Sequence, residues 1–172
     1  LEKKFKYIDK KFLFINSGFN LRPTDIQAAI ALSQFKSLNN IIKIMKTNRG
    51  KMIKELTGDK RWDNQVRFVE KSNNIKPSYF GLTMLLNKKF VSNKGLILNR
   101  MDKFGIETRP IIGGNFLKQP ALRKYNIKHK AKDFPNANYI HQHGLFVGLK
   151  NKILSRAESM NFANIFFKSF KF

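Results

Sequence analysis

Apolar residues recur at helical spacing in the first third of the chain, and they predict two consecutive helices. The first is expected to begin at Thr24, where Thr24 and Gln27 form a capping box, and to end near residues 39–40. Its apolar face consists of Ile26, Ala29, Ile30 and Phe35. The second is expected to end at Gly58, a typical C-terminal residue of a helix. Its apolar stripe consists of Ile41, Ile42, Ile44, Met45, Met52, Ile53 and Leu56.

After the second helix the pattern changes, and short apolar runs predict strands between helices. Strands are expected at residues 66–69, 79–86, 106–109 and 145–148, and helices at 94–104, 121–125, 135–143 and 151–172. This order predicts an α+β fold, in which a helical pair is followed by a small, mainly antiparallel sheet with helices on one face.

Composition agrees with an ordinary folded domain. The chain has 172 residues, of which 42% are hydrophobic and 17 are Phe, enough for a hydrophobic core. It contains no Cys, which excludes disulfides and thiolate metal sites and fits a cytoplasmic protein. The longest apolar run is too short to span a bilayer, so no membrane segment is expected. The chain does not start with Met, and we expect it to be part of a longer protein.

The charge is strongly positive, with 34 Lys and Arg against 11 Asp and Glu and a net charge of +23. Such a field attracts nucleic acid, anionic membranes and phosphorylated substrates. The basic residues are scattered, however, and no RNA-recognition motif, zinc finger or basic zipper is present, which disfavours nucleic-acid binding. A stand-alone basic module that binds RNA or an anionic surface remains the alternative interpretation.

Two segments carry candidate binding chemistry. Arg109 precedes Pro110, which favours an extended backbone, and the Gly113-Gly114 pair follows; a strand that delivers a guanidinium to a rigid glycine corner could bind an anion. Asn20 and Arg22 lie just before the first helix, where backbone N–H groups favour a phosphate. The alternatives are a solvated arginine at a strand end and a helix start that is only capped.

Other chemistry finds little support in the sequence. His141 and His143 are two residues apart, but on a helix their side chains diverge, so no metal site is expected. No nucleophile elbow, Walker loop or convincing pair of acid and base carboxylates is present. We therefore assign no catalytic residue to this chain.

Four ordered motifs resemble the DegT/DnrJ/StrS family of pyridoxal-phosphate sugar aminotransferases. They are residues 18–29 (GFNLRPTDIQAA), 77–81 (PSYFG), 107–116 (ETRPIIGGNF) with 119–121 (QPA), and 134–137 (FPNA) with 143–148 (HGLFVG). The resemblance is strongest to the nucleotide-sugar 3-dehydratases, which act on 4-keto-6-deoxyhexoses linked to CDP or GDP, although Lys150 stands where those sequences often carry histidine. It implies the C-terminal part of a fold-type I enzyme, with residues 1–58 ending the large cofactor domain and residues 59–172 forming the small domain.

The resemblance also implies roles for single residues. Asn20 matches an asparagine that contacts the pyridoxal-phosphate phosphate of the partner subunit in a homodimer. Arg109 matches an arginine near the substrate side of the active site, and Arg22 is also assigned to substrate binding. The family's cofactor lysine, or the histidine that replaces it, lies in a Ser-x-x-x-Lys/His segment before a Gly-Glu-Gly-Gly run. The Gly-Glu-Gly-Gly run is absent, and the one serine that stands four residues before a lysine, Ser72 before Lys76, leads into a predicted strand instead. The chain alone is therefore expected to be inactive.

Overall fold

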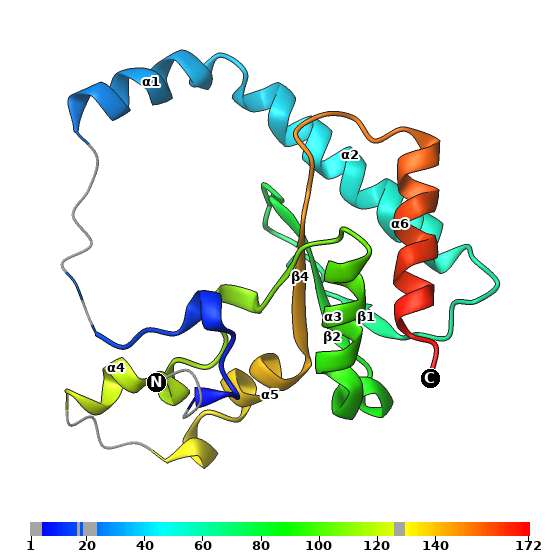
Figure 1. Cartoon of the computed structure of the whole chain (residues 1–172). Helices are drawn as coiled ribbons and strands as arrows, with labels where there is room; N and C mark the ends of the chain where they lie inside the picture. The colour runs from blue at the N-terminus through cyan, green and yellow to red at the C-terminus, as the bar shows by residue number, and fades with distance from the viewer. Residues whose placement is uncertain (1–4, 17, 19–23, 126–129) are drawn as a thin grey trace.

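The computed structural model describes residues 5–16, 18, 24–125 and 130–172 (Figure 1). The helices are α1 (Asp25–Phe35), α2 (Leu38–Thr57), α3 (Lys94–Lys103), α4 (Pro120–Arg123), α5 (Pro135–His143) and α6 (Arg156–Ser169). The strands are β1 (Val66–Phe68), β2 (Gly81–Leu86), β3 (Thr108–Arg109) and β4 (Gly144–Gly148). Short 3-10 helices are η2 (Lys10–Phe12), η3 (Lys88–Asn93), η4 (Ile111–Gly113), η5 (Phe116–Lys118) and η6 (Ala131–Asp133).

The four strands form one antiparallel sheet in the order β1-β2-β4-β3. Val147 of β4 lies between Leu82 of β2 and Thr108 of β3, and all three side chains share the face that is buried. Phe146 and Arg109 therefore lie on the opposite face, because side chains alternate along a strand. The antiparallel sheet confirms the predicted fold class.

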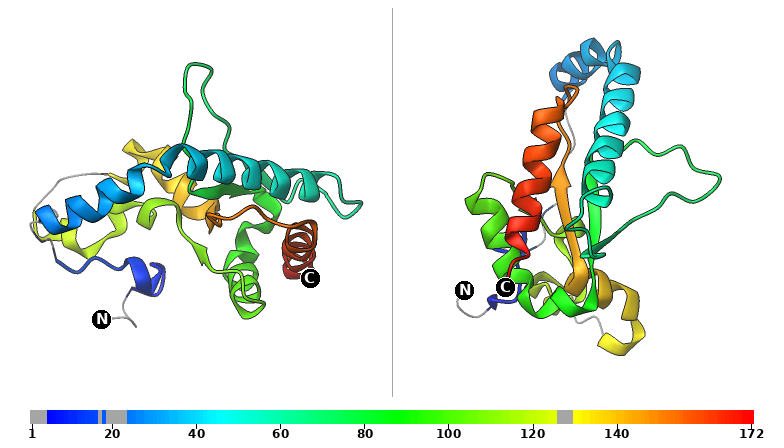
Figure 2. Two further views of the ribbon diagram at one scale, coloured as in Figure 1. Left: turned by 90° about the horizontal axis from the view of Figure 1, so that it is seen from above. Right: turned by 90° about the vertical axis from the view of Figure 1, so that its right-hand side faces the viewer.

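One hydrophobic core joins the sheet to three helices. Leu82, Met84, Leu86, Leu145 and Val147 of the sheet belong to the same buried cluster as Met52 and Leu56 of α2, Ile97 and Met101 of α3, and Phe162 and Phe166 of α6. Figure 2 shows α3 and α6 side by side on one face of the sheet, with α2 crossing near one end. The segment between β1 and β2 projects on the other side.

Most predicted elements are confirmed to within a few residues. The first two helices are separated only at residues 36–37, and Gln27 Oε1 accepts a hydrogen bond from the Thr24 N–H at 2.8 Å, as the capping box requires. The prediction that the last helix begins at residue 151 is wrong. Ser155 and Glu158 form a complete capping box, so α6 begins five residues later.

Helix α1 differs from the other long helices because it buries none of its residues. The side chains of Ile26, Ile30 and Phe35 are 75%, 61% and 67% exposed, respectively. The predicted apolar face therefore exists, but nothing in the described part of the chain covers it.

No helix in the described ranges is both long and apolar enough to span a membrane.

Candidate functional site

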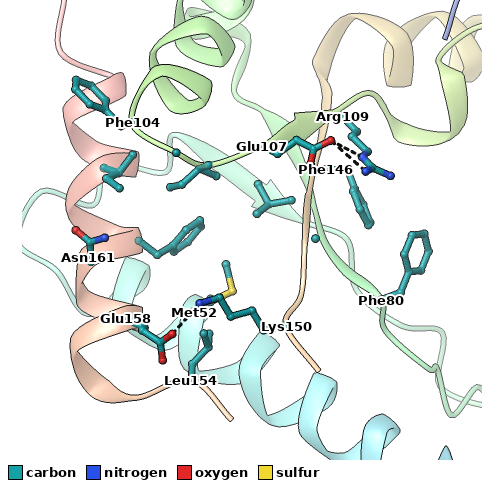
Figure 3. A pocket seen from close by; sticks show the side chains of 16 residues that line it. Met52, Phe80, Phe104, Glu107, Arg109, Phe146, Lys150, Leu154, Glu158 and Asn161 are labelled. Carbon is teal, nitrogen blue, oxygen red and sulfur yellow. Dashed lines mark hydrogen bonds and ion pairs between the residues drawn. The ribbon is translucent and has the colours of Figure 1, made fainter. Parts of the chain in front are cut away.

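A cavity of about 540 Å³ lies beside the short edge strand β3 and contains Arg109. Its walls are the α3–β3 connection, β4 and α6, and Met52 of α2 contributes to its lining. Figure 3 shows two ion pairs in it, Glu107 with Arg109 at β3 and Lys150 with Glu158 at the start of α6. The cavity thus combines apolar walls with charged groups on two sides, a composition typical of ligand sites.

Local sequence places Arg109 in this cavity. Pro110 has φ −65° and ψ 155°, and its ring favours the extended conformation of the preceding residue. Arg109 pairs with Phe146 in the sheet, whereas the adjacent Thr108 points to the buried face. The predicted position of Arg109 at a strand end is therefore confirmed, while its role in binding remains a prediction.

The guanidinium of Arg109 is held by Glu107. Arg109 Nε and Nη2 each lie 3.1 Å from Glu107 Oε1, and Lys11 Nζ lies 3.7 Å from the same oxygen. The hydrogen bond from Arg109 lowers the pKa of Glu107, and the charges of Arg109 and Lys11 lower it further. Glu107 is therefore anionic near neutral pH. The side chain of Arg109 is still 53% exposed, so several of its five N–H donors remain available to a ligand.

Aromatic rings extend the site next to Arg109. The rings of Phe80 and Phe146 are 4.8 Å apart, and Phe80 is 70% exposed. Phe146 lies directly over Gly81, where a Cβ atom would come within 1.8 Å of its Cζ. An aromatic, apolar surface beside a guanidinium suits a ligand that carries both a ring and an anionic group.

The second ion pair has a structural explanation. Lys150 Nζ lies 2.7 Å from Glu158 Oε1, and Glu158 Oε2 accepts from the Ser155 N–H at 2.8 Å. The hydrogen bond from Lys150, followed by those from the Ser155 backbone and side chain, lowers the pKa of Glu158 to about 2. Glu158 therefore caps α6 and holds Lys150 at the rim of the cavity.

The glycine corner does not line the Arg109 cavity. Gly113 and Gly114 have φ of +68° and +77°, and a Cβ atom at Gly114 would come within 2.4 Å of His141 Nδ1. The Asn115 N–H donates to this same nitrogen at 3.1 Å. Arg109 and the Gly113-Gly114 pair therefore do not form the single anion-binding site that the sequence had predicted. The guanidinium lines the cavity beside β3, whereas the glycines allow the His141 ring to approach the backbone closely.

The remaining predicted residues have different outcomes. Asn20 and Arg22 lie outside the described residues, so their assignment stays a prediction. His143 is buried and stacks on Tyr139 at 4.0 Å, and its Nδ1 lies 2.7 Å from the Leu86 carbonyl oxygen. Both histidines of α5 thus have structural partners. The described ranges contain no group of three or more side chains suited to hold a metal ion.

Sequence reasoning missed two features that shape this site. Asn48 of α2 is fully buried and binds the segment before α6. Its position continues the apolar stripe of α2 at the spacing of Met45, Met52 and Leu56, and a polar residue at such a position is a signal for a buried hydrogen-bond partner. The stacking of Phe146 on Gly81 had no comparable local signal, because it depends on strand pairing.

A model of the DegT/DnrJ/EryC1/StrS aminotransferase family matches residues 2–159. The GDP-4-keto-6-deoxy-D-mannose 3-dehydratase of Yersinia pseudotuberculosis is 30% identical over 147 residues, which are 86% of this chain and 36% of that protein. The enzyme of the same name from Escherichia coli is 31% identical over 140 residues, or 81% of this chain and 34% of the relative. The chain thus spans about a third of the length of these relatives.

Two solved structures show the same arrangement of elements. The Escherichia coli GDP-4-keto-6-deoxy-D-mannose-3-dehydratase with bound hydrated PLP has a TM-score of 0.67 and 25% identity, covering 95% of this chain and 39% of that one. A mutant of GDP-4-keto-6-deoxymannose-3-dehydratase with bound GDP-perosamine has a TM-score of 0.66 and 26% identity, covering 92% and 40%.

Proposed function

Because this chain belongs to the DegT/DnrJ/EryC1/StrS aminotransferase family, we propose that it forms the C-terminal part of a pyridoxal-phosphate-dependent enzyme acting on a nucleotide-linked 4-keto-6-deoxyhexose. The reaction is either 3-dehydration or amino transfer, and it serves the synthesis of deoxysugars for a surface polysaccharide. The match over residues 2–159, together with coverage of only about a third of the related dehydratases, carries this proposal. Residues 1–58 would end the cofactor domain, and residues 59–172 would form the small domain.

Arg109 is proposed to bind the anionic part of the substrate, with Arg22 as a second cationic contact. The exposed N–H donors of Arg109 and the neighbouring Phe80–Phe146 surface support this role, because a nucleotide-linked sugar carries both phosphates and rings. Glu107 would keep the guanidinium in place before the substrate arrives, since it already binds Nε and Nη2.

The cofactor contact is proposed for Asn20, which would reach the pyridoxal-phosphate phosphate of the partner subunit in a homodimer. The described side chains do not form a cofactor site by themselves, so we assign the cofactor to the complete enzyme and derive no reaction step through it. In that enzyme the cofactor serves as the electron sink for chemistry at the sugar. Without the segment that carries the cofactor lysine or histidine, the isolated chain would be inactive, and we propose a cytoplasmic location for the complete enzyme.

The coding DNA upstream of Leu1 tests this proposal. An open frame encoding a Ser-x-x-x-Lys/His segment and a Gly-Glu-Gly-Gly run is the expected result, with lysine indicating an aminotransferase and histidine a dehydratase. A start codon directly before Leu1, with no such frame, would contradict the proposal. In the full-length dimer, Asn20→Ala should weaken retention of pyridoxal phosphate without loss of folded protein.

The net charge of +23 favours one other candidate, a basic module for RNA or anionic surfaces. Binding to RNA through diffuse charge should weaken steeply as salt rises and show no sequence preference. Filter binding of several unrelated single-stranded RNAs from low to moderate salt distinguishes the two. Tight binding of one sequence that survives moderate salt would favour the RNA module over the enzyme.

A further inference from the structure

A second cavity, of about 690 Å³, lies among residues 6–11, α3 and α5. It shares no lining residue with the Arg109 cavity. Its charged lining residues are Lys6, Lys11, Lys94, Lys118, Asp9 and Asp102. Four ammonium groups against two carboxylates give the cavity an excess of positive charge, and low-dielectric walls strengthen the field of such a set.

Lys94 is the least hydrated of these cations. It is partly buried, and its Nζ donates to the His141 carbonyl oxygen at 2.9 Å. Burial lowers the pKa of Lys94 to about 8. Among the residues that the structure describes, no carboxylate lies within ion-pair distance of it. A cation removed from water without a counter-ion is unfavourable, and a bound anion would relieve this cost.

The His141 ring lies close to the same positive groups. Its Nδ1 accepts from the Asn115 N–H, so the proton of the neutral ring is on Nε2. Burial lowers the pKa of His141 most, and the charges of Lys118 and Lys94 lower it further, against a hydrogen bond with the Tyr7 backbone. Lys94, Lys118 and His141 therefore converge at one wall of the cavity.

The two carboxylates of the cavity do not neutralise this wall. Asp102 Oδ1 accepts from the Thr108 N–H at 3.1 Å, and Asp9 Oδ1 accepts from the Lys11 N–H at 2.9 Å. Each carboxylate is thus hydrogen-bonded to a nearby backbone N–H group and not to a lysine of this wall. The described ion pairs leave Lys94 and Lys118 without a carboxylate partner.

We propose that this second cavity is a binding site for a phosphate group, held between Lys94 and Lys118 with His141 beside it. Ammonium groups bind phosphate as point charges, and the volume is ample for a phosphate carried by a small molecule. A bound phosphate favours the charged forms of its neighbours, so it raises the pKa of His141. The site lies outside the substrate site proposed above and does not depend on the cofactor.

The test is an NMR titration of the His141 ring in the chain as it stands, with inorganic phosphate added at constant ionic strength. A saturable rise in the pKa of His141 is expected, and Lys94→Met should weaken phosphate binding about tenfold or more. Lys103→Met is the matched control, because Lys103 is exposed on the same helix and does not line the cavity. Lys118→Met gives a second test if Lys94→Met does not fold.

Two results would overturn the proposal. One is a His141 pKa that does not respond to phosphate in a saturable way. The other is an equal loss of binding in the Lys103→Met variant, which would mean general attraction by the net charge of +23. A parallel titration with GDP identifies the source of the phosphate: tighter binding than inorganic phosphate indicates a nucleotide ligand, and equal binding indicates free phosphate. Because neither probe needs a working enzyme, failure here leaves the proposed enzymatic function untouched.

Discussion

Asn48 and Leu154 are joined by a buried hydrogen bond, in which Asn48 Oδ1 accepts from the Leu154 N–H at 2.9 Å. Asn48 Nδ2 also donates to the carbonyl oxygens of Lys150 and Lys152, at 2.9 and 2.8 Å. One amide of α2 therefore satisfies three backbone groups of the segment between β4 and α6. This segment forms one side of the Arg109 cavity, so the hydrogen bonds of Asn48 also help to determine the shape of that cavity.

Asn48→Ala should lower the free energy of unfolding by about 2–4 kcal/mol, because it leaves three backbone groups without their partner, among them the buried Leu154 N–H. Urea denaturation followed by circular dichroism measures the change. Asn40→Ala on the same helix is the control, since Asn40 is exposed, and it should stay within about 0.5 kcal/mol of the parent chain. Equal effects of the two substitutions would show that the hydrogen bonds of Asn48 do not contribute to the stability of the fold.

Gly81→Ala should destabilise the sheet by about 1–3 kcal/mol, because the new Cβ would overlap the Phe146 ring and force it to move. Gly148→Ala is the matched control. Gly148 is the direct partner of Gly81 in the antiparallel pair, and a Cβ there meets no atom within 4 Å. In a Phe146→Leu background the cost of Gly81→Ala should shrink, which a double-mutant cycle of unfolding free energies detects. An unchanged cost in that background would contradict the proposed overlap.

The ionisation of Glu158 predicts a pH dependence of stability. Its pKa in the folded chain is lowered from 4.5 to about 2, so the folded state favours the carboxylate. The resulting stabilisation is fully present above pH 4.5, and it is lost as the pH falls towards 2. Glu158→Gln keeps the capping-box geometry but removes the charge. The difference between the urea midpoints of the two proteins should therefore be largest near pH 6 and shrink below pH 4.5; a difference independent of pH would argue against this ionisation.

Arg109→Met in the full-length enzyme should raise the KM for the nucleotide-linked sugar about tenfold or more, since a charge-assisted contact with the substrate is lost. Steady-state kinetics measure the effect. Arg67→Met is the control, because Arg67 is an exposed arginine of β1 and does not line the cavity. Glu107→Gln should also raise KM, though less than Arg109→Met, because the guanidinium keeps its charge but is held less firmly before the substrate binds. An Arg109→Met enzyme with unchanged KM would show that Arg109 does not bind the substrate.

The sequence was sufficient to predict the helices and strands, but not the contacts between elements that lie far apart in the chain. Capping residues and helical spacing placed the ends of α2 and α3 closely, since both are set by residues within one or two turns. The position of β4 between β2 and β3 depends on pairing across more than 30 residues, which no local pattern specifies.

The candidate site shows the same division. Pro110 and the strand pattern placed Arg109 correctly. The partial burial of Lys94 depends on the docking of residues 6–11 and α5 around α3, so no local pattern indicated the second cavity.

The exposure of α1 has a consequence for how the chain unfolds. A helix of 11 residues that buries no side chain is marginal in water, because packing supplies most of the stability of helices in proteins. Its amides should exchange hydrogen through local fraying, while those of α2 near Met52 and Leu56 open only with the whole core. The cooperative unit thus begins within α2, and weakening the cap at Thr24 would leave the global unfolding free energy unchanged.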